Sequence, residues 1–161
     1  MTVRLLALVA PLAAGAGAGL PAWLLSVEAK ATLRELWETS AAAHRERVAC
    51  LGGAVGDDTV RITRARILDG VQSDSLNASA GASIERCAPP EWVGTVHTHV
   101  RSTDDDVPAP RFSPGDRAVM SEWSRRHGRA GAFCVLYSAR GAHCEVYPPR
   151  EEPRMLRPGR R

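Results

Sequence analysis

Residues 92–116 read WVGTVHTHVRSTDDDVPAPRFSPGD, and they combine an apolar run, two histidines and a helix start. The apolar run predicts a short buried strand. His97 and His99 end it two residues apart, and because side chains alternate along a strand, both imidazoles point to the same face. A loop then leads to a predicted helix with Asp116 in its first turn. Two nitrogen ligands and one oxygen ligand can converge there, the number that a catalytic zinc site takes from the protein.

Each part of this segment also has an ordinary structural explanation. Two histidines on one strand can form a surface pair, but an interior imidazole pair is costly without a metal or a polar partner. Ser113, Pro114 and Asp116 match a helix capping box, and the helix dipole stabilises the carboxylate there. Capping does not exclude metal binding, because one carboxylate oxygen can cap while the other binds a metal. His97, His99 and Asp116 therefore remain metal-ligand candidates.

Length and composition predict one globular domain with loose ends. The chain has 161 residues, of which 44% are hydrophobic, enough for a core. Its net charge is +3, and the excess lies largely in the last twelve residues, 150–161. The sequence has no basic stripe with interleaved aromatic residues, so a nucleic-acid partner is not expected.

The four cysteines form no C-x-x-C pair, which disfavours a cysteine zinc site. Cys134 and Cys144 flank a predicted hairpin turn, so they can face each other. A disulfide between them requires an oxidising compartment. Otherwise the three cysteines in predicted strands, Cys50, Cys134 and Cys144, are interpreted as small buried residues.

The two ends of the chain are predicted to lie outside the folded domain. Arg4 precedes an apolar run rich in Ala and Gly, so residues 1–22 are interpreted as a secretory signal peptide or as a disordered extension. We favour a cytoplasmic location, with export as the alternative, and expect membrane contact only if this segment is retained. The domain is predicted over residues 23–147, and the Arg- and Pro-rich tail at 148–161 is predicted to be disordered.

Hydrophobic periodicity predicts the elements of that domain. Helices are expected at 27–43 and 114–126, with a loop at 71–83 and one helical turn at 83–87. Strands are expected at 23–27, 45–55, 59–68, 91–98, 131–137 and 142–147. This order predicts a single α/β domain with a mixed, mostly antiparallel sheet flanked by helices.

Glu46 opens the strand predicted at 45–55. A zinc hydrolase needs an acidic residue that does not bind the metal and that takes a proton from water, and Glu46 is the candidate for this role. The sequence resembles the JAMM (MPN+) zinc metalloproteases in several motifs. They are Glu46, His97-Thr98-His99 and Ser113-Pro114-Gly115-Asp116, together with Val93-Gly94-Thr95-Val96 before the histidines. The likeness spans residues 23–147. It implies a JAB/MPN fold, which is cytidine-deaminase-like, and zinc held by His97, His99 and Asp116. It also implies Glu46 as general base and acid, and Ser113 as hydrogen-bond donor to the tetrahedral intermediate.

The resemblance implies a prokaryotic-type metallopeptidase or isopeptidase that acts on a protein or peptide. The family suggests the Gly-tailed C-terminus of a ubiquitin-like or sulfur-carrier protein as substrate. The alternative is a non-catalytic MPN-fold module for binding or scaffolding, but such proteins usually lose ligands, and here all are present. A zinc deaminase is disfavoured, because those enzymes need a P-C-x-x-C context.

The sequence departs from the family in one spacing. The usual pattern is H-x-H-x(7)-S-x-x-D, whereas thirteen residues, 100–112, separate His99 from Ser113 here. Either this segment is a substrate-contacting insertion, or one of Asp104, Asp105 and Asp106 replaces Asp116 as ligand. We favour the insertion, because Ser113 and Asp116 keep their mutual spacing.

Overall fold

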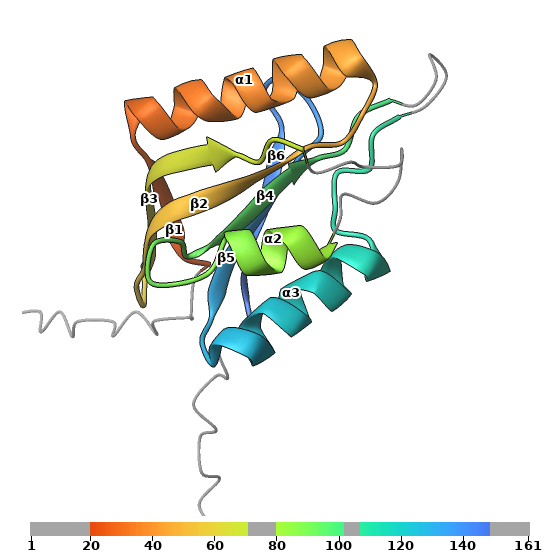
Figure 1. Cartoon of the computed structure of the whole chain (residues 1–161). Coiled ribbons are helices and arrows are strands. Elements are labelled where there is room, and N and C mark those ends of the chain that lie inside the picture. Colours follow the sequence, from red (N-terminus) through yellow and green to blue (C-terminus); the bar gives the residue numbers. More distant parts are fainter. Residues whose placement is uncertain (1–19, 71–79, 102–106, 149–161) are drawn as a thin grey trace, which may run out of the picture.

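The computed structural model describes residues 20–70, 80–101 and 107–148. In this part of the chain, six strands form one sheet and three helices flank it (Figure 1). The predicted α/β class, with a mixed sheet flanked by helices, is confirmed. The elements in chain order are β1 (Ala22–Leu25), α1 (Val27–Ala43), β2 (Val48–Val55), β3 (Thr59–Ile67), α2 (Ala80–Arg86), β4 (Gly94–Thr98), α3 (Pro114–His127), β5 (Gly131–Leu136) and β6 (Ala142–Tyr147).

The strands lie in the order β1-β3-β2-β4-β5-β6. The β1–β3 and β4–β5 pairs are parallel and the other three pairs are antiparallel, so the mostly antiparallel sheet is confirmed. In the β2–β3 hairpin, the Gly56 N–H donates to the Thr59 carbonyl at 2.9 Å. The pairing register shifts between Gly52 and Gly53, where a side chain on Gly53 would collide with the Arg61 carbonyl. Such a bulge bends the paired strands.

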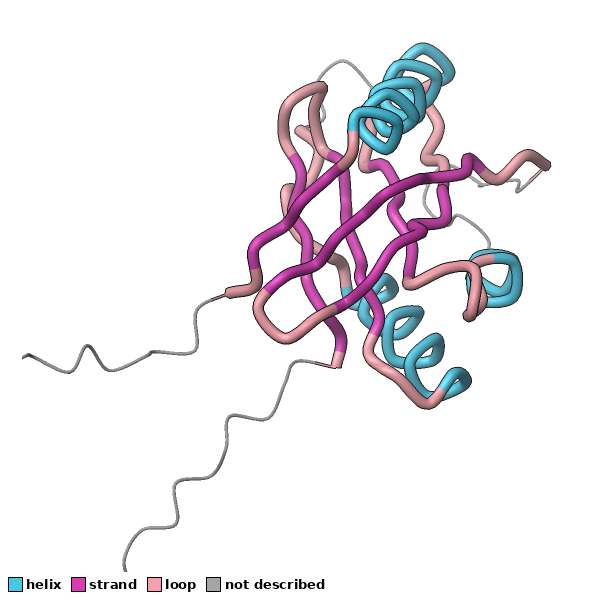
Figure 2. Tube along the Cα trace, turned by 90° about the vertical axis from the view of Figure 1, so that its left-hand side faces the viewer, coloured by secondary structure: helices cyan, strands magenta, loops and turns pink. Residues whose placement is uncertain are grey.

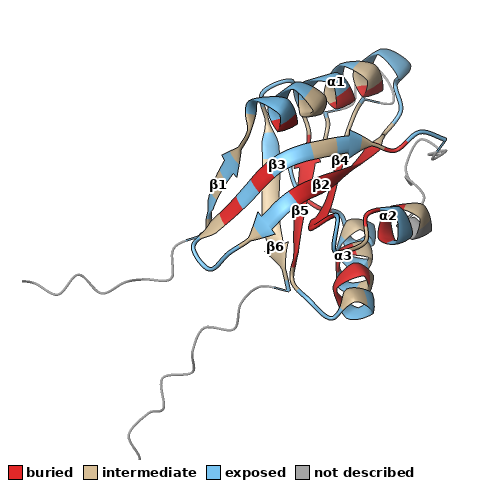
Figure 3. Cartoon of the chain, turned by 60° about the vertical axis from the view of Figure 1, so that its left-hand side comes forward, coloured by how far each residue is buried: buried red, intermediate tan, exposed pale blue. Residues whose placement is uncertain are grey.

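Helix α1 covers one face of the sheet, and α2 and α3 lie on the other, as Figures 1 and 2 both show. The apolar side of α1 places Ala29 and Leu36 in a core cluster with residues of the strands. On the opposite face, Trp123 of α3 packs against Phe133. Burial is greatest on the central strands, and every residue of β5 is buried (Figure 3). Strands covered on both faces are typically apolar along their whole length, and β5, with the sequence GAFCVL, fits this pattern.

Several predicted boundaries are wrong. Strand β1 ends at Leu25 and not at residue 27, and β4 begins at Gly94 and not at residue 91. The helical turn expected at 83–87 is the longer helix α2, Ala80–Arg86. Its first four residues, Ala80-Gly81-Ala82-Ser83, are too small to produce an apolar stripe, so periodicity did not reveal it. Strand β2 begins at Val48 and not at residue 45. Helix α1 ends in the left-handed residue His44, with φ of 49°, and the chain turns back before it pairs, so Glu46 precedes the strand instead of opening it.

The predictions for the chain ends, and parts of the predictions for two loops, concern residues outside the described part of the chain. Residues 1–19, 71–79, 102–106 and 149–161 lie outside the described part, so the proposed signal peptide or extension, the loop at 71–79 and the disordered tail stay predictions. None of the helices described has the length and apolar character needed to cross a membrane.

Candidate metal centre

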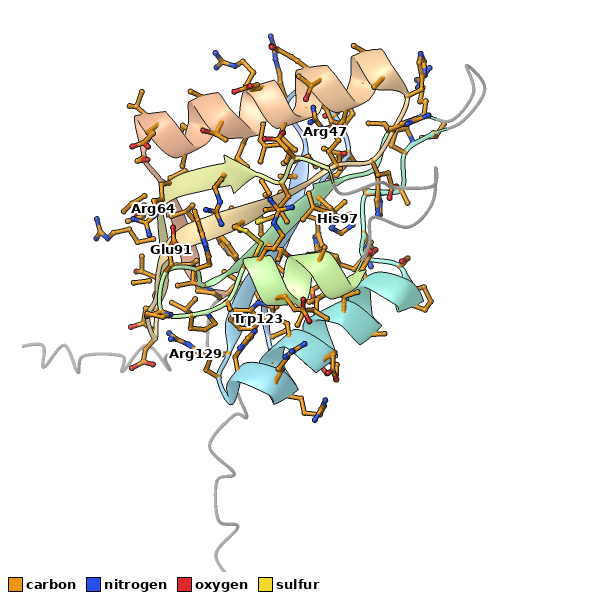
Figure 4. All side chains as sticks on the ribbon, in the orientation of Figure 1. Arg47, Arg64, Glu91, His97, Trp123 and Arg129 are labelled. Atoms are coloured by element: carbon orange, nitrogen blue, oxygen red, sulfur yellow. A yellow bond between two sulfur atoms is a disulfide. The ribbon has the colours of Figure 1, made fainter. Side chains whose placement is uncertain are left out.

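The two histidines lie where β4 passes the first turn of α3. His97 is part of β4, and His99 continues its pairing with β5, because the His99 N–H donates to the Leu136 carbonyl at 2.8 Å. This pairing keeps the strand alternation past the last residue of β4, so both rings lie on the same face. Figure 4 shows His97 on the side of the sheet that α2 and α3 cover. Asp116 approaches from that side in the first turn of α3.

The side chains of His97, His99 and Asp116 converge. His97 Nε2 lies 3.1 Å from Asp116 Oδ1, His99 Nε2 lies 3.4 Å from Asp116 Oδ2, and the two Nε2 atoms are 3.1 Å apart. One ligand atom from each residue falls within 4.8 Å of the others. Tetrahedral zinc with bonds of about 2.0–2.1 Å places neighbouring ligand atoms about 3.3 Å apart. The three residues are therefore close enough to hold one metal ion.

A backbone carbonyl fixes which nitrogen of His99 faces the cluster. His99 Nδ1 lies 2.8 Å from the Ala109 carbonyl, and because a carbonyl only accepts hydrogen bonds, we assign the hydrogen to Nδ1. In the neutral ring, Nε2 then carries a lone pair, which faces His97 and the Asp116 carboxylate. Acceptors placed this close need a proton or a cation between them. Metal-binding histidines commonly donate their second N–H to a carbonyl in this way.

Asp116 both caps α3 and faces the histidines. Its Oδ2 accepts the Ser113 N–H at 2.7 Å, and Ser113 Oγ accepts the Asp116 N–H at 3.2 Å, which completes the predicted capping box. The carboxylate is thereby held in one orientation with Oδ1 turned toward His97. Burial alone would raise the pKa of Asp116, but hydrogen bonds from His97 and His99 outweigh burial and hold this pKa well below its usual range. The carboxyl group is ionised at any physiological pH, as a metal ligand must be.

Glu46 stands beside this cluster. Burial raises the pKa of the Glu46 carboxyl, the charges of His99 and His97 lower it in part, and the charge of Asp116 raises it further. These couplings require that Glu46 lies within electrostatic reach of all three residues. A half-buried carboxylate whose pKa is raised is suited to accept a proton near neutral pH.

A buried hydroxyl holds the segment that carries Glu46. Thr98, between the two histidines, is fully buried, and its Oγ1 accepts the Arg47 N–H at 2.9 Å. The same oxygen lies 2.9 Å from Ser40 Oγ of α1, to which it donates. Thr98 also donates its own N–H to the Arg47 carbonyl at 3.1 Å. The segment next to Glu46 is therefore bound to the residue that separates the candidate ligands.

A polar group that was not predicted from the sequence lies next to the cluster. Arg117 donates to both carboxylate oxygens of Glu145, each at 2.9 Å, and His143 Nε2 lies 2.8 Å from Glu145 Oε1. The buried Phe112 ring lies between them and the cluster, 6.0 Å from the His97 ring and 5.5 Å from the His143 ring. The hydrogen bonds from Arg117 lower the pKa of Glu145, burial opposes this, and His143 adds to the lowering. Phe112 and this group support one side of the site.

The predicted hairpin contained the information needed to place His143 on the same face of the sheet as His97. The register pairs His97 with Val135 and Val135 with His143, so the two histidines share a face of the sheet. Two strand pairings had to be assigned before this was visible. The remaining histidines lie at helix ends: His44 caps α1, and His127 ends α3 with its Nε2 3.2 Å from the Ile84 carbonyl.

The structure brings His97, His99 and Asp116 together, with Glu46 beside them and Ser113 bonded to Asp116. The alternative carboxylates, Asp104 to Asp106, lie outside the described residues. Asp116 reaches the histidines with the longer spacing between His99 and Ser113 in place, so ligation does not require a replacement.

Among known proteins, a solved structure is similar to this chain. No protein-family model matches this sequence, and no curated protein matches it. Among solved structures, it is similar to the crystal structure of a JAB1/MPN domain protein from Archaeoglobus fulgidus. The match has 17% sequence identity, covers 80% of this chain and 86% of that chain, and has a TM-score of 0.34. These values are too low to assign a family or a function, which must therefore be inferred from the residues of this chain.

Proposed function

We propose that this chain is a zinc-dependent metallopeptidase of the JAMM type that hydrolyses a peptide or isopeptide bond. One observation carries the proposal: two imidazole nitrogens and a carboxylate converge closely enough to hold one metal ion, and Glu46, outside this set, lies within electrostatic reach of all three residues. Three protein ligands leave one coordination position for water or substrate, which distinguishes catalytic zinc sites from structural ones.

The donor set favours zinc. Imidazole nitrogens suit zinc, copper, iron and nickel, whereas magnesium and calcium take oxygen ligands. Two nitrogens with one carboxylate also occur in zinc peptidases. Zinc bound by His97, His99 and Asp116 would polarise the scissile carbonyl and lower the pKa of water toward about 7.

The other two residues take roles that their positions permit. Glu46 accepts the proton of the attacking water and passes it to the leaving amine, because its carboxylate lies beside the ligands without belonging to them. Ser113 Oγ accepts a hydrogen bond from the Asp116 N–H and keeps its own hydrogen to donate. Directed at the developing oxyanion, such a donor stabilises the transition state by roughly 3 kcal/mol.

Metal analysis and a cleavage assay test the proposal together. We expect the purified full chain to carry about one zinc per molecule, and His97→Ala and His99→Ala to lose it. His127→Gln is the matched control, because its imidazole lies at the other end of α3 from Asp116, and this variant should keep its zinc. A folded wild-type chain that binds no zinc would end the proposal.

Glu46→Gln separates binding from catalysis. It should keep zinc and lose turnover on a fluorogenic peptide library, because an amide cannot accept the proton. Turnover equal to wild type would remove Glu46 from the mechanism. A zinc-loaded wild type that binds library peptides without cleaving any of them would instead favour the non-catalytic module.

A further inference from the structure

We propose that this domain folds and works in an oxidising compartment outside the cytoplasm, and that the bond it cleaves belongs to an extracytoplasmic polypeptide. The assignment of an extracytoplasmic substrate rests on the proposed function. The carrying observation is that all four cysteines of the chain are paired, Cys50 with Cys87 and Cys134 with Cys144. The hairpin pair was anticipated from the sequence, and the other was not.

The cysteines do not form a thiolate metal site. The register pairs Cys50 with Thr95 and Thr95 with Phe133, so these three side chains share the α2–α3 face. Cys134 follows Phe133 in β5 and therefore points to the α1 face. The two cysteine pairs lie on opposite faces of the sheet, so four sulfur atoms cannot surround one ion.

Both disulfides are structural crosslinks. Cys50 and Cys87 are 0% exposed, Cys134 is 5% exposed and its partner Cys144 is half-buried, whereas redox-sensing and catalytic cysteines need solvent access. Each bond joins separate elements: β2 to the residue after α2, and β5 to β6. Cytoplasmic thiol systems keep such cysteines reduced in most organisms, while secreted and envelope proteins retain the bonds.

The Cys50–Cys87 bond also supports the metal centre indirectly. Helix α2 has only seven residues and is followed by Cys87, whose carbonyl accepts the Trp123 Nε1–H of α3 at 3.0 Å. The disulfide therefore anchors α2 to the sheet at the point where α2 holds α3. Because α3 carries Asp116 in its first turn, the oxidised form favours the arrangement in which the ligands converge.

The substrate class follows from the compartment. A ubiquitin-like or sulfur-carrier tail in the cytoplasm would not meet an enzyme whose fold is crosslinked by two disulfides. The apolar run after Arg4 has the composition of an export signal. The expected substrate is a peptide or protein of the cell envelope or the medium.

The compartment is tested in cells of the organism that makes the full chain. Intact cells are treated with N-ethylmaleimide, fractionated and analysed by non-reducing peptide mass spectrometry. We expect the chain in the extracytoplasmic fraction, without alkylated cysteines, and with linked peptides that pair Cys50 with Cys87 and Cys134 with Cys144. A cytoplasmic chain with four alkylated cysteines overturns the proposal. Neither result depends on catalysis, so failure of the peptidase activity leaves this test intact.

The substrate class is tested with zinc-loaded, oxidised protein. Envelope and cytosolic protein extracts are incubated with wild type or with Glu46→Gln, and new N-termini are labelled and sequenced. We expect wild type alone to produce new N-termini, and only in the envelope extract. New N-termini confined to the cytosolic extract overturn the substrate half of the proposal.

Discussion

Thr98 accepts the backbone N–H of Arg47 at 2.9 Å, so the residue between the two histidines is bonded to the residue after Glu46. The regular β2–β4 ladder begins one position later, where Val48 pairs with His97. The Thr98 hydroxyl thus extends the contact between the strands beyond the ladder, and its bond to Ser40 connects α1 to the same point. Helix α1, strand β4 and the segment that precedes β2 therefore meet at one buried oxygen next to the candidate metal ligands.

Replacing Thr98 with valine should lower catalysis without removing the metal. Thr98→Val keeps the side-chain shape but leaves the Arg47 N–H and the Ser40 hydroxyl without this partner, at a cost of about 1–3 kcal/mol in the free energy of unfolding. Because the ligands stay in place while the Glu46 segment loosens, we expect kcat to fall with little change in KM or zinc content. Urea unfolding, metal analysis and steady-state kinetics measure the three quantities.

Thr98→Ser is the matched control. Serine restores the hydroxyl in a similar position and should recover most of kcat, although it loses a buried methyl group. Equal losses of kcat in the serine and valine variants would show that packing, and not the hydroxyl, positions Glu46.

The metal-free protein should lose stability as the pH rises above about 6.5, the ordinary pKa of histidine. Burial lowers the pKa of His99, but its hydrogen bonds to Asp116 and the Ala109 carbonyl, with the charge of Glu46, outweigh burial and raise it. Because the pKa of His99 is higher in the folded state than in the unfolded state, protonation of its ring stabilises the fold. This contribution is complete at pH values below the unfolded-state pKa, and it is lost as the pH rises through the folded-state pKa. Urea unfolding of chelator-treated protein across this range measures the decline.

Two comparisons identify the source of that decline. His99→Gln should flatten it, while His127→Gln should keep it. Zinc should suppress it in the wild type, because the metal replaces the proton between His99 and Asp116. A metal-free wild type whose stability does not change between pH 6 and 8 would contradict the assigned role of His99.

The acid side of the profile has the opposite sign. The pKa of Asp116 is lower in the folded state than its ordinary value, so the ionised carboxylate stabilises the fold. This contribution is present at pH values above the ordinary carboxyl pKa of about 4, and it is lost as the pH falls through the folded-state pKa. Asp116→Asn should therefore reduce the stability of the metal-free protein at pH 5 to 6 and have less effect in strong acid, as urea unfolding at both pH values would show. An effect of the same size at both would argue against an ionised Asp116.

The candidate ligands could be found from the sequence because their geometry is local. Two residues on one strand share a face wherever that strand lies, so His97 and His99 were placed by spacing alone. Ser113 and Asp116 carry a capping signature that fixes the start of α3. The Cys134–Cys144 pair could likewise be anticipated, because a hairpin sets its own register.

The features that were missed depend on distant parts of the chain. The path of Glu46 depends on the left-handed residue His44 and on a hydrogen bond to Thr98, fifty-one residues from Arg47. Cys50 and Cys87 are thirty-seven residues apart and belong to different elements, and spacing does not reveal such a pair.

Gly94→Ala should displace β4 and weaken zinc binding. A Cβ at this position would collide with the carbonyl of Ala132, its register partner on β5. Backbone must move to relieve the clash, so we expect a loss of more than about 2 kcal/mol in the free energy of unfolding. Gly128→Ala is the control: its φ of +62° adds strain of about 1–2 kcal/mol, but no atom lies within 4 Å of the added Cβ. If Gly128→Ala weakens zinc binding as much as Gly94→Ala does, displacement of β4 is not the cause.

The two disulfides should differ in their contributions to stability. In the chain-entropy account, a crosslink stabilises the fold by restricting the unfolded chain, and the effect grows with the loop that it closes. The Cys50–Cys87 bond spans 37 residues and the Cys134–Cys144 bond spans 10. Removing the first with Cys50→Ala and Cys87→Ala should cost about 4 kcal/mol, and removing the second with Cys134→Ala and Cys144→Ala about 3 kcal/mol. Urea unfolding of each double variant under non-reducing conditions measures the difference. A larger loss from the shorter loop would show that packing around the sulfur atoms outweighs chain entropy.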